Sequence, residues 1–149
     1  MQENRKTILG NSTDVKMHGK WRSEESCLSA TTRLLRIARK HNRRVHVLHI
    51  TTAQEMELLA KNKDIASVEV LPIHLTLNAP DCYERLRRFA QQNPLVREAH
   101  HQDAPWEAVR NGLVDIIGSD DAPPPIKEEN ESYPNQPSGT PTGQTKVHL

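Results

Sequence analysis

Three short runs of β-branched residues alternate with helical segments through the middle of this 149-residue chain. The runs cover residues 44–50, 67–72 and 113–117, and each has the length and composition of a β-strand. Because strands that alternate with helices are joined by crossover connections, the order predicts parallel βα units. Three strands alone make a poor parallel sheet, since such sheets are covered on both faces or closed into a barrel. The pattern therefore predicts an α/β fold from which part of the sheet is missing.

Capping signals predict the helices that lie beside these strands. Ser23 suits the N-cap of a helix that Asn42 can close. Thr52 and Glu55 have the spacing of a capping box, which predicts a helix directly after the first strand. Two further helices are expected to begin at prolines, Pro80 and Pro105, the second opening at Asp103 or Ala104.

Composition divides the chain into three parts. Residues 1–22 are polar and lack periodicity, so we expect an irregular N-terminal segment. Residues 23–121 carry nearly all the aliphatic side chains. Residues 122–149 hold most of the prolines and are expected to be a Pro-rich loop or tail, because they bury too little apolar surface to offset their ordering entropy.

The charge and the apolar content exclude several classes of function. A formal net charge of +1 gives no general attraction for nucleic acid or an anionic membrane. The basic residues at 33–44 are expected on the solvated face of one helix. The sequence has no apolar run of the ~20 residues that cross a bilayer, and its first residues do not resemble a secretory signal. With two distant cysteines, these features favour a cytoplasmic protein.

The ends of the strands carry the candidate chemical groups. His49 ends the first strand and Asp120 follows the third, at the edge where catalytic groups of α/β barrels collect. An imidazole and a carboxylate from neighbouring strand ends can bind one divalent metal, commonly zinc. Each residue alone is more often structural than functional.

Strand periodicity and local polarity give expectations for the remaining side chains. Alternation places His49 on the same side as Val45 and Val47, and predicts that His46 faces the covering helices. With Val70, these valines are expected to line an uncovered sheet face. The remaining histidines are expected in solvent or in a polar loop: His18, His41 and His148 in the first group, His100 and His101 in the second.

Four stretches of the sequence resemble successive landmarks of the dihydroorotases. These are metal-dependent cyclic amidohydrolases, with allantoinases and hydantoinases among their relatives. The resemblance covers residues 20–146 in the correct order. The stretches that carry it are residues 45–52, 68–75, 92–97 and 115–123.

The resemblance implies a partial TIM (β/α)₈ barrel. The three strands would be the sixth, seventh and eighth, so the chain would be a C-terminal barrel fragment. The family's His-x-His pair, its bridging lysine or aspartate and a further histidine would then lie upstream of Met1. Of the family's metal ligands, two have counterparts here.

The resemblance also assigns roles to individual residues. His49 and Asp120 would be metal ligands for zinc, Asp120 would also be the catalytic acid–base, and Asn93 would contact the substrate. His74 would have a supporting role. The chain departs from the family at Leu95 and in residues 121–124, where two usual histidines are replaced, and this predicts weakened substrate binding.

The implied function is that of a dihydroorotase-like cyclic amide hydrolase of de novo pyrimidine biosynthesis, which interconverts dihydroorotate and carbamoyl aspartate. Because most metal ligands are missing, we expect a truncated fragment that is inactive or weakly active. One alternative is a non-catalytic interaction subunit that binds another barrel fragment, a second copy or aspartate transcarbamoylase. Another is an allantoinase or hydantoinase fragment. Whether the chain is itself an enzyme stays open.

Overall fold

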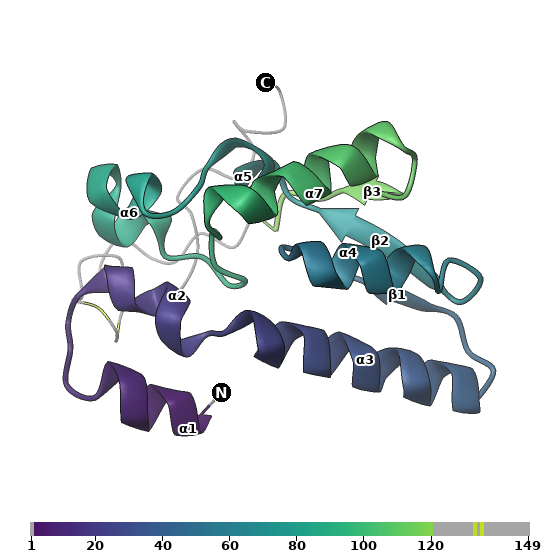
Figure 1. Ribbon diagram of the computed structural model, residues 1–149, viewed down its shortest axis with the longest axis horizontal. Coiled ribbons are helices and arrows are strands. Elements are labelled where there is room, and N and C mark those ends of the chain that lie inside the picture. The colour runs from purple at the N-terminus through teal and green to yellow at the C-terminus, as the bar shows by residue number, and fades with distance from the viewer. Residues whose placement is uncertain (1, 121–132, 134, 136–149) are drawn as a thin grey trace.

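The fold is built on a three-stranded parallel sheet, as the computed structural model shows for residues 2–120, 133 and 135 (Figure 1). The strands are β1 (Val45–Val47), β2 (Ala66–Val70) and β3 (Ile116–Ile117), in the order β1-β2-β3. All pairs are parallel, with Val47 opposite Val68 and Val70 opposite Ile117. The predicted α/β class with a parallel sheet is therefore confirmed, with strands shorter than the sequence indicated.

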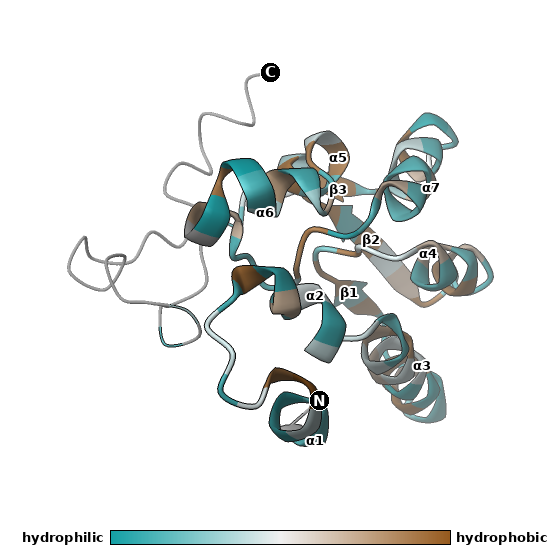
Figure 2. Ribbon diagram, turned by 60° about the vertical axis from the view of Figure 1, so that its left-hand side comes forward, coloured by the Kyte–Doolittle hydropathy of each residue, from teal (hydrophilic) through white to brown (hydrophobic). Residues whose placement is uncertain are grey.

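Three helices lie along one face of the sheet. They are α3 (Glu24–Lys40), α4 (Ala53–Ala60) and α7 (Ala99–Arg110), and Figure 2 shows them side by side next to the strands. Their apolar side chains form the main core with those of the strands, including Leu35, Met56, Leu59, Val68 and Val70. The helices thus fix the sheet from one side.

The caps predicted for α3 and α4 are present. The Ser23 hydroxyl accepts a hydrogen bond from Ser26 N at 3.4 Å, and the Thr52 hydroxyl accepts one from Glu55 N at 3.3 Å. Glu55 is buried, and its carboxylate accepts hydrogen bonds from the hydroxyls of Thr31 (2.7 Å) and Thr52 (2.8 Å). The glutamate of this capping box, Glu55, therefore also ties α4 to α3.

The start of α7 differs from the expectation. The helix begins at Ala99 rather than at Asp103 or Ala104, and Pro105 lies inside it. A proline there removes one intrahelical hydrogen bond. Packing outweighs the preference of proline for the first turn of a helix, because Pro105 and His101 are both buried on this helix.

Short helices gather around the carboxyl ends of the strands. The segment before α3, expected to be irregular, forms short helical turns whose Trp21 packs with Leu9 and Tyr133. The division into three domains stays a prediction, because most of residues 122–149 lie outside the described part of the chain. The elements are α1 (Gln2–Asn4), η1 (Arg5–Leu9), η2 (Val15–Met17), α2 (His18–Trp21), α5 (Pro72–Thr76), α6 (Asp81–Arg85) and η3 (Arg87–Ala90).

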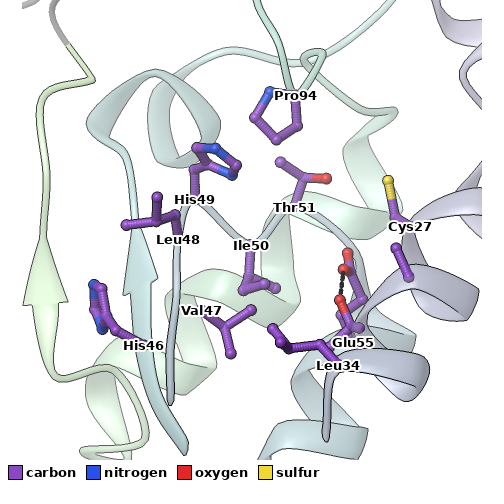
Figure 3. A pocket seen from close by; sticks show the side chains of 12 residues that line it. Cys27, Leu34, His46, Val47, Leu48, His49, Ile50, Thr51, Glu55 and Pro94 are labelled. Atoms are coloured by element: carbon purple, nitrogen blue, oxygen red, sulfur yellow. Dashed lines mark hydrogen bonds between the residues drawn. The ribbon is translucent and has the colours of Figure 1, made fainter. Parts of the chain in front are cut away.

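The helices cover the face of the sheet that was expected to be open, and they leave the other face open. Val45, Val47 and Val70 pack into the core against the helices instead of lining an open face. His46 and Leu48 lie on the other side of β1 and are exposed, as Figure 3 shows. Alternation predicts which side chains of β1 share a face, but it does not tell which face the helices cover.

No helix among the described residues combines the length and the apolar character needed to cross a lipid bilayer.

Candidate functional site

The predicted ligand residues His49 and Asp120 occupy equivalent positions beyond two strands. His49 follows β1 by two residues and Asp120 follows β3 by three. Both have left-handed backbone, with φ of 43° and 48° respectively. Because β1 has ended before His49, the alternation of strand side chains does not extend to it. His49 turns instead toward Pro94, above the strand end (Figure 3).

His49 shares a hollow with the predicted substrate residue Asn93. The hollow has a volume of about 310 Å³ and lies between the start of α3, the end of β1 and the loop at residues 92–95. Arg22 and Cys27 also line it. We call this the His49 hollow. The structure thus brings together a histidine, an amide and a cation that are up to 71 residues apart in sequence, the span from Arg22 to Asn93.

Asp120 is connected to the same loop. Gln92, which precedes Asn93, donates a hydrogen bond from Nε2 to Asp120 Oδ2 at 3.0 Å. Gln92 is buried while Asp120 is exposed. The loop therefore carries Asn93 at the His49 hollow and steadies Asp120 through the adjacent residue.

Two buried histidines hold this loop. His18 Nε2 lies 3.1 Å from the carbonyl oxygen of Gln92, and His74 Nε2 lies 3.0 Å from that of Pro94. Burial lowers the pKa of each histidine to about 4, and the charge of Arg22 adds to the effect on His18. Both rings are therefore neutral near pH 7. The expectation of a solvated His18 was wrong, because α2 folds it under the loop.

Arg97 connects the segments that form the His49 hollow. Its guanidinium is buried and donates to the Arg22 carbonyl oxygen (2.9 Å), to Cys27 Sγ (3.1 Å) and to Thr51 Oγ1 (3.4 Å). These partners belong to the segment before α3, to α3 itself and to the end of β1. Arg97 fixes the relative positions of the walls on either side of His49.

The side chains of His49 and Asp120 fit a zinc ion by type. Imidazole nitrogen and carboxylate oxygen are both zinc ligands. Within the described residues, neither ring nitrogen of His49 forms a hydrogen bond, so its lone pair is available. A structural or catalytic zinc site takes three or four protein ligands. His49 and Asp120 can therefore form part of a zinc site, and further ligands are needed to complete it.

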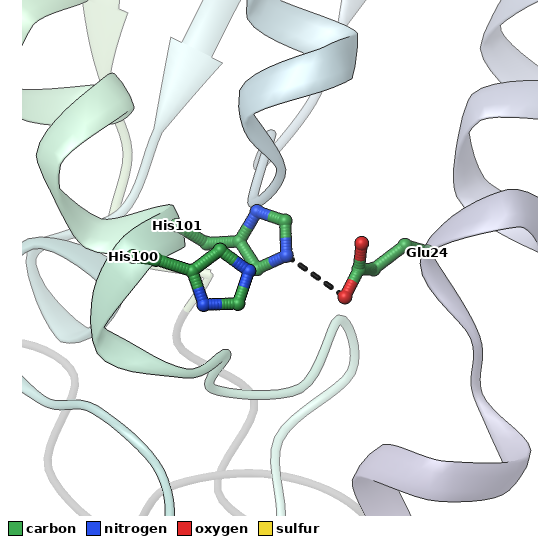
Figure 4. A group of neighbouring side chains, drawn as sticks. All are labelled: Glu24, His100 and His101. Atoms are coloured by element: carbon green, nitrogen blue, oxygen red, sulfur yellow. Dashed lines mark ion pairs between the residues drawn. The ribbon is translucent and has the colours of Figure 1, made fainter.

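A second group of metal-ligand types lies near the start of α7. Ligand atoms of Glu24, His100 and His101 lie within 4.8 Å of one another (Figure 4). His101 is buried, so its expected place in a polar loop was wrong. Its Nδ1 accepts a hydrogen bond from Ala53 N at 3.3 Å, which places the proton on Nε2, 2.8 Å from Glu24 Oε1. That proton occupies the position a metal would need, so the group serves to join α3, α4 and α7.

The open sheet face carries a ladder of polar side chains. His46 Nδ1 lies 2.7 Å from Ser67 Oγ, and its Nε2 lies 3.3 Å from Glu69 Oε2. The Glu69 carboxylate occupies the space above Gly118, where an added Cβ would lie 2.7 Å from Glu69 Cδ. Gly118 is thus the residue in the third strand segment that makes room for this ladder. His46 does not face the helices, contrary to expectation.

Comparisons with known proteins agree with the resemblance found in the sequence. No protein-family model matches the chain. The dihydroorotase of Methanosarcina acetivorans is 30% identical over 95% of this chain and 32% of its own length. The allantoinase of Streptomyces avermitilis is 35% identical over 64% of this chain and 22% of its own length. The chain thus spans between about a quarter and a third of the length of the dihydroorotases it matches.

Solved structures show the same relationship in the fold. A D-hydantoinase crystal structure superposes with a TM-score of 0.83 at 26% identity, over 94% of this chain and 33% of that structure. The L-hydantoinase of Arthrobacter aurescens superposes with a TM-score of 0.87 over 97% of this chain and 33% of its own, and at 24% identity it supports the fold alone.

Proposed function

We propose that this chain, a relative of the dihydroorotases and hydantoinases along most of its length, supplies His49, Asn93 and Asp120 to the site of a zinc-dependent cyclic amidohydrolase. The observation that carries the proposal is that all three residues lie at or are held by the loop at residues 92–95. His49 and Asn93 line one hollow, and Gln92 beside Asn93 holds Asp120. A loop at the carboxyl end of a parallel sheet that carries one candidate group, holds a second and lies beside the third is typical of an α/β active site.

The roles of these residues follow from their chemistry. Zinc, when bound, would supply Lewis acidity and a water of lowered pKa. Asp120 would accept the proton of the attacking water and deliver it to the ring nitrogen as the carbon–nitrogen bond breaks, acting as a base and then as an acid. Asn93 would hydrogen-bond the substrate. The products of this ring opening are a carboxylate and a free amide or ureido group.

Dihydroorotate is the substrate we favour among cyclic amides. Arg22 is one of the residues that line the His49 hollow, and we propose that its positive charge acts on a substrate bound there. Dihydroorotate carries a carboxylate that such a charge attracts, whereas the unsubstituted hydantoin ring carries none. The substitution Arg22→Gln is expected to weaken dihydroorotate binding more than hydantoin binding. Equal losses for the two ligands would remove the basis for this preference.

Completion of the site requires more protein than the described residues provide. The open sheet face, formed by His46, Leu48, Ser67 and Glu69, has no covering element among the residues that the structure describes. We propose that this face packs against further strands of a (β/α)₈ barrel that are not among these 149 residues. Those strands would also bring the missing zinc ligands. Of the partners expected from the resemblance, a further barrel fragment fits this face best.

A non-catalytic role is the second candidate. Residues 121–124 read Asp-Ala-Pro-Pro, and proline has no side-chain donor to hold a substrate. This departure lies next to Asp120 and favours a dihydroorotase-like piece that keeps the fold without turnover. The two candidates differ in substrate binding, which the first requires and the second does not.

Zinc titration of the purified chain tests the proposal. We expect weak binding by calorimetry, at least tenfold weaker in His49→Ala and in Asp120→Asn. The exposed His41 gives a matched control, and His41→Ala is expected to bind zinc as the unchanged chain does. We expect no hydrolysis of dihydroorotate by the chain alone, because two ligands do not assemble the site. Equal zinc affinity in all variants would overturn the assignment of His49 and Asp120.

A further inference from the structure

We infer that Gln92 is a positioning residue that holds the Asp120 carboxylate through Oδ2 and thereby makes Oδ1 the oxygen that binds zinc. The role of Asp120 as a zinc ligand rests on the proposed function. The way in which Gln92 holds Asp120 rests on contacts within this chain. The inference adds to the proposed site a residue that acts on the metal through one of its ligands.

The contact with Asp120 fixes the orientation of the Gln92 amide. Gln92 Nε2 lies 3.0 Å from Asp120 Oδ2. The reverse orientation would bring the amide oxygen against a carboxylate oxygen, and neither atom can donate when the carboxylate is ionised. The NH₂ group therefore faces Asp120, and the hydrogen bond is charge-assisted because its acceptor carries a negative charge.

Burial keeps the Gln92 side chain in place. The residue is 3% exposed, and its main-chain carbonyl oxygen lies 3.1 Å from His18 Nε2. Its side-chain oxygen Oε1 is buried without a hydrogen-bond partner among the described residues. An unpaired buried amide oxygen lowers the stability of a fold, and an apolar side chain of the same length would avoid that cost. The polar contact that a glutamine provides here is the one to Asp120.

Asp120 depends on this bond because the sheet has already ended. The last main-chain hydrogen bond of its segment, within the part of the chain that the structure describes, runs from Gly118 N to the Val70 carbonyl oxygen at 3.0 Å. Asp120 lies two residues further along and is exposed. A carboxylate at such a position samples several rotamers unless a side-chain contact selects one of them. The bond from the buried Gln92 makes that selection.

The hydrogen bond gives the two oxygens of the Asp120 carboxylate different roles. Oδ2 accepts from Gln92, and Oδ1 forms no hydrogen bond with any residue that the structure describes. Carboxylates that bind a metal are themselves held by hydrogen bonds, and loss of such a partner typically weakens metal binding about 10- to 100-fold. Gln92 thus prepares Asp120 to bind zinc through one oxygen.

Zinc titration of Gln92→Met separates this role from a purely structural one. Methionine keeps the length and the unbranched shape of glutamine but cannot donate a hydrogen bond. We expect the zinc affinity, measured by calorimetry, to fall about tenfold. The melting temperature should not fall, because the unpaired amide oxygen is removed as well.

Gln102 gives the matched contrast, since its amide supports the fold away from Asp120. It donates to the main-chain carbonyl oxygens of Leu75 (2.9 Å) and Leu77 (3.2 Å). Gln102→Met is expected to lower the melting temperature and to bind zinc as the unchanged chain does. A Gln92→Met variant that behaves in this way, with lower stability and unchanged zinc affinity, would overturn the inference.

A double-mutant cycle shows whether Gln92 acts through Asp120. Asp120→Ala is expected to lower the zinc affinity at least tenfold. Adding Gln92→Met to that variant should cause no further loss, because the carboxylate that Gln92 holds is already gone. Losses that multiply in the double variant would show that Gln92 affects zinc by another route, and they would overturn the inference.

The side-chain amide signals of Gln92 test the hydrogen bond in the unchanged chain, so this measurement does not depend on the folding of a variant. In ¹H–¹⁵N spectra at pH 7, we expect the Gln92 NH₂ pair to exchange slowly with solvent, and to do so at saturating zinc as well, since zinc takes Oδ1 and leaves the bond to Oδ2. Zinc that moves the pair to the values of a free glutamine side chain would overturn the inference.

The outcomes also separate the inference from the proposed function. Zinc binding that Gln92→Met leaves unaltered would overturn the inference alone. Absence of zinc binding by the unchanged chain would overturn the proposed function and the inference with it.

Discussion

His18 and His74 hold one loop from two different elements. His18 Nε2 lies 3.1 Å from the Gln92 carbonyl oxygen and His74 Nε2 lies 3.0 Å from the Pro94 carbonyl oxygen. Both rings donate to acceptors that cannot themselves donate, so both must be neutral or doubly protonated. Burial lowers the pKa of each to about 4, which selects the neutral form at pH 7. Candidate substrate and metal residues thus depend on two uncharged histidines.

The stability of the chain is expected to fall as the pH drops from about 6.5 to about 4. The unfolded chain takes up protons on His18 and His74 near their ordinary pKa of 6.5, whereas the folded chain does so only near 4. In this window the unfolded state binds more protons, which lowers the free energy of unfolding by up to about 1.4 kcal/mol per pH unit for each histidine. Urea midpoints at pH 7, 6 and 5 measure the slope. His74→Gln should flatten it, and an unchanged slope in that variant would contradict the assignment.

Removing the buried carboxylate of Glu55 is expected to weaken the contact between α3 and α4. Glu55→Ala leaves the hydroxyls of Thr31 and Thr52 without their acceptor, at a cost of about 1–3 kcal/mol in the free energy of unfolding. Glu57 lies exposed on the same helix and gives the control. Glu57→Ala should change stability by less than about 0.5 kcal/mol. Chemical denaturation of the two variants compares them, and equal losses would show that the hydroxyl contacts add nothing.

An alanine at position 118 is expected to displace the Glu69 carboxylate. The added Cβ would lie 2.7 Å from Glu69 Cδ and 2.9 Å from Oε2, so the carboxylate must move and its contact with His46 is lost. The expected cost is modest, because a flexible side-chain end gives way. A double-mutant cycle of Gly118→Ala and Glu69→Ala should show coupling, since the second change removes the obstacle to the first. If the two substitutions lower the free energy of unfolding in a strictly additive way, the loss caused by Gly118→Ala arises from the backbone at this position and not from contact with Glu69.

The hydrogen bond from Trp21 to Tyr133 is expected to stabilise the cluster around the N-terminal turns. Trp21 Nε1 donates to the Tyr133 hydroxyl at 2.8 Å, and both side chains are buried. Tyr133→Phe keeps the ring and leaves the indole N–H unpaired, at a cost of about 1 kcal/mol or somewhat more. Tyr133→Ala also removes the packing with Leu9 and should cost clearly more. Thermal unfolding followed by tryptophan fluorescence measures both, and a neutral Tyr133→Phe would refute the role of the bond.

Local signals in the sequence were sufficient where short-range chemistry decides the structure. Ser23 and Thr52 cap the helices that they were expected to cap, and the three strands follow in the expected order. The carboxyl-edge positions of His49 and Asp120 follow from that order. These features depend on neighbours within a few residues, which the sequence displays directly.

Tertiary contacts decided the features that the sequence did not reveal. His18 and His101 stand in polar stretches without periodicity, and no local pattern marks them as buried. The covered face of β1 depends on where α3 and α4 pack, and alternation is the same for both faces. The hydrogen bond from Gln92 to Asp120 joins residues 28 positions apart. Such contacts between distant segments leave no trace in propensity or spacing.

The left-handed backbone at His49 and Asp120 lowers the stability of the fold at the two positions whose side chains are proposed to bind zinc. A side chain in this conformation costs on the order of 1 kcal/mol, and glycine relieves it. Substituting glycine at either position should therefore make the chain harder to melt while erasing a donor atom for zinc. An engineer who optimised this molecule for heat resistance alone would delete its two proposed metal-binding residues among the first changes made.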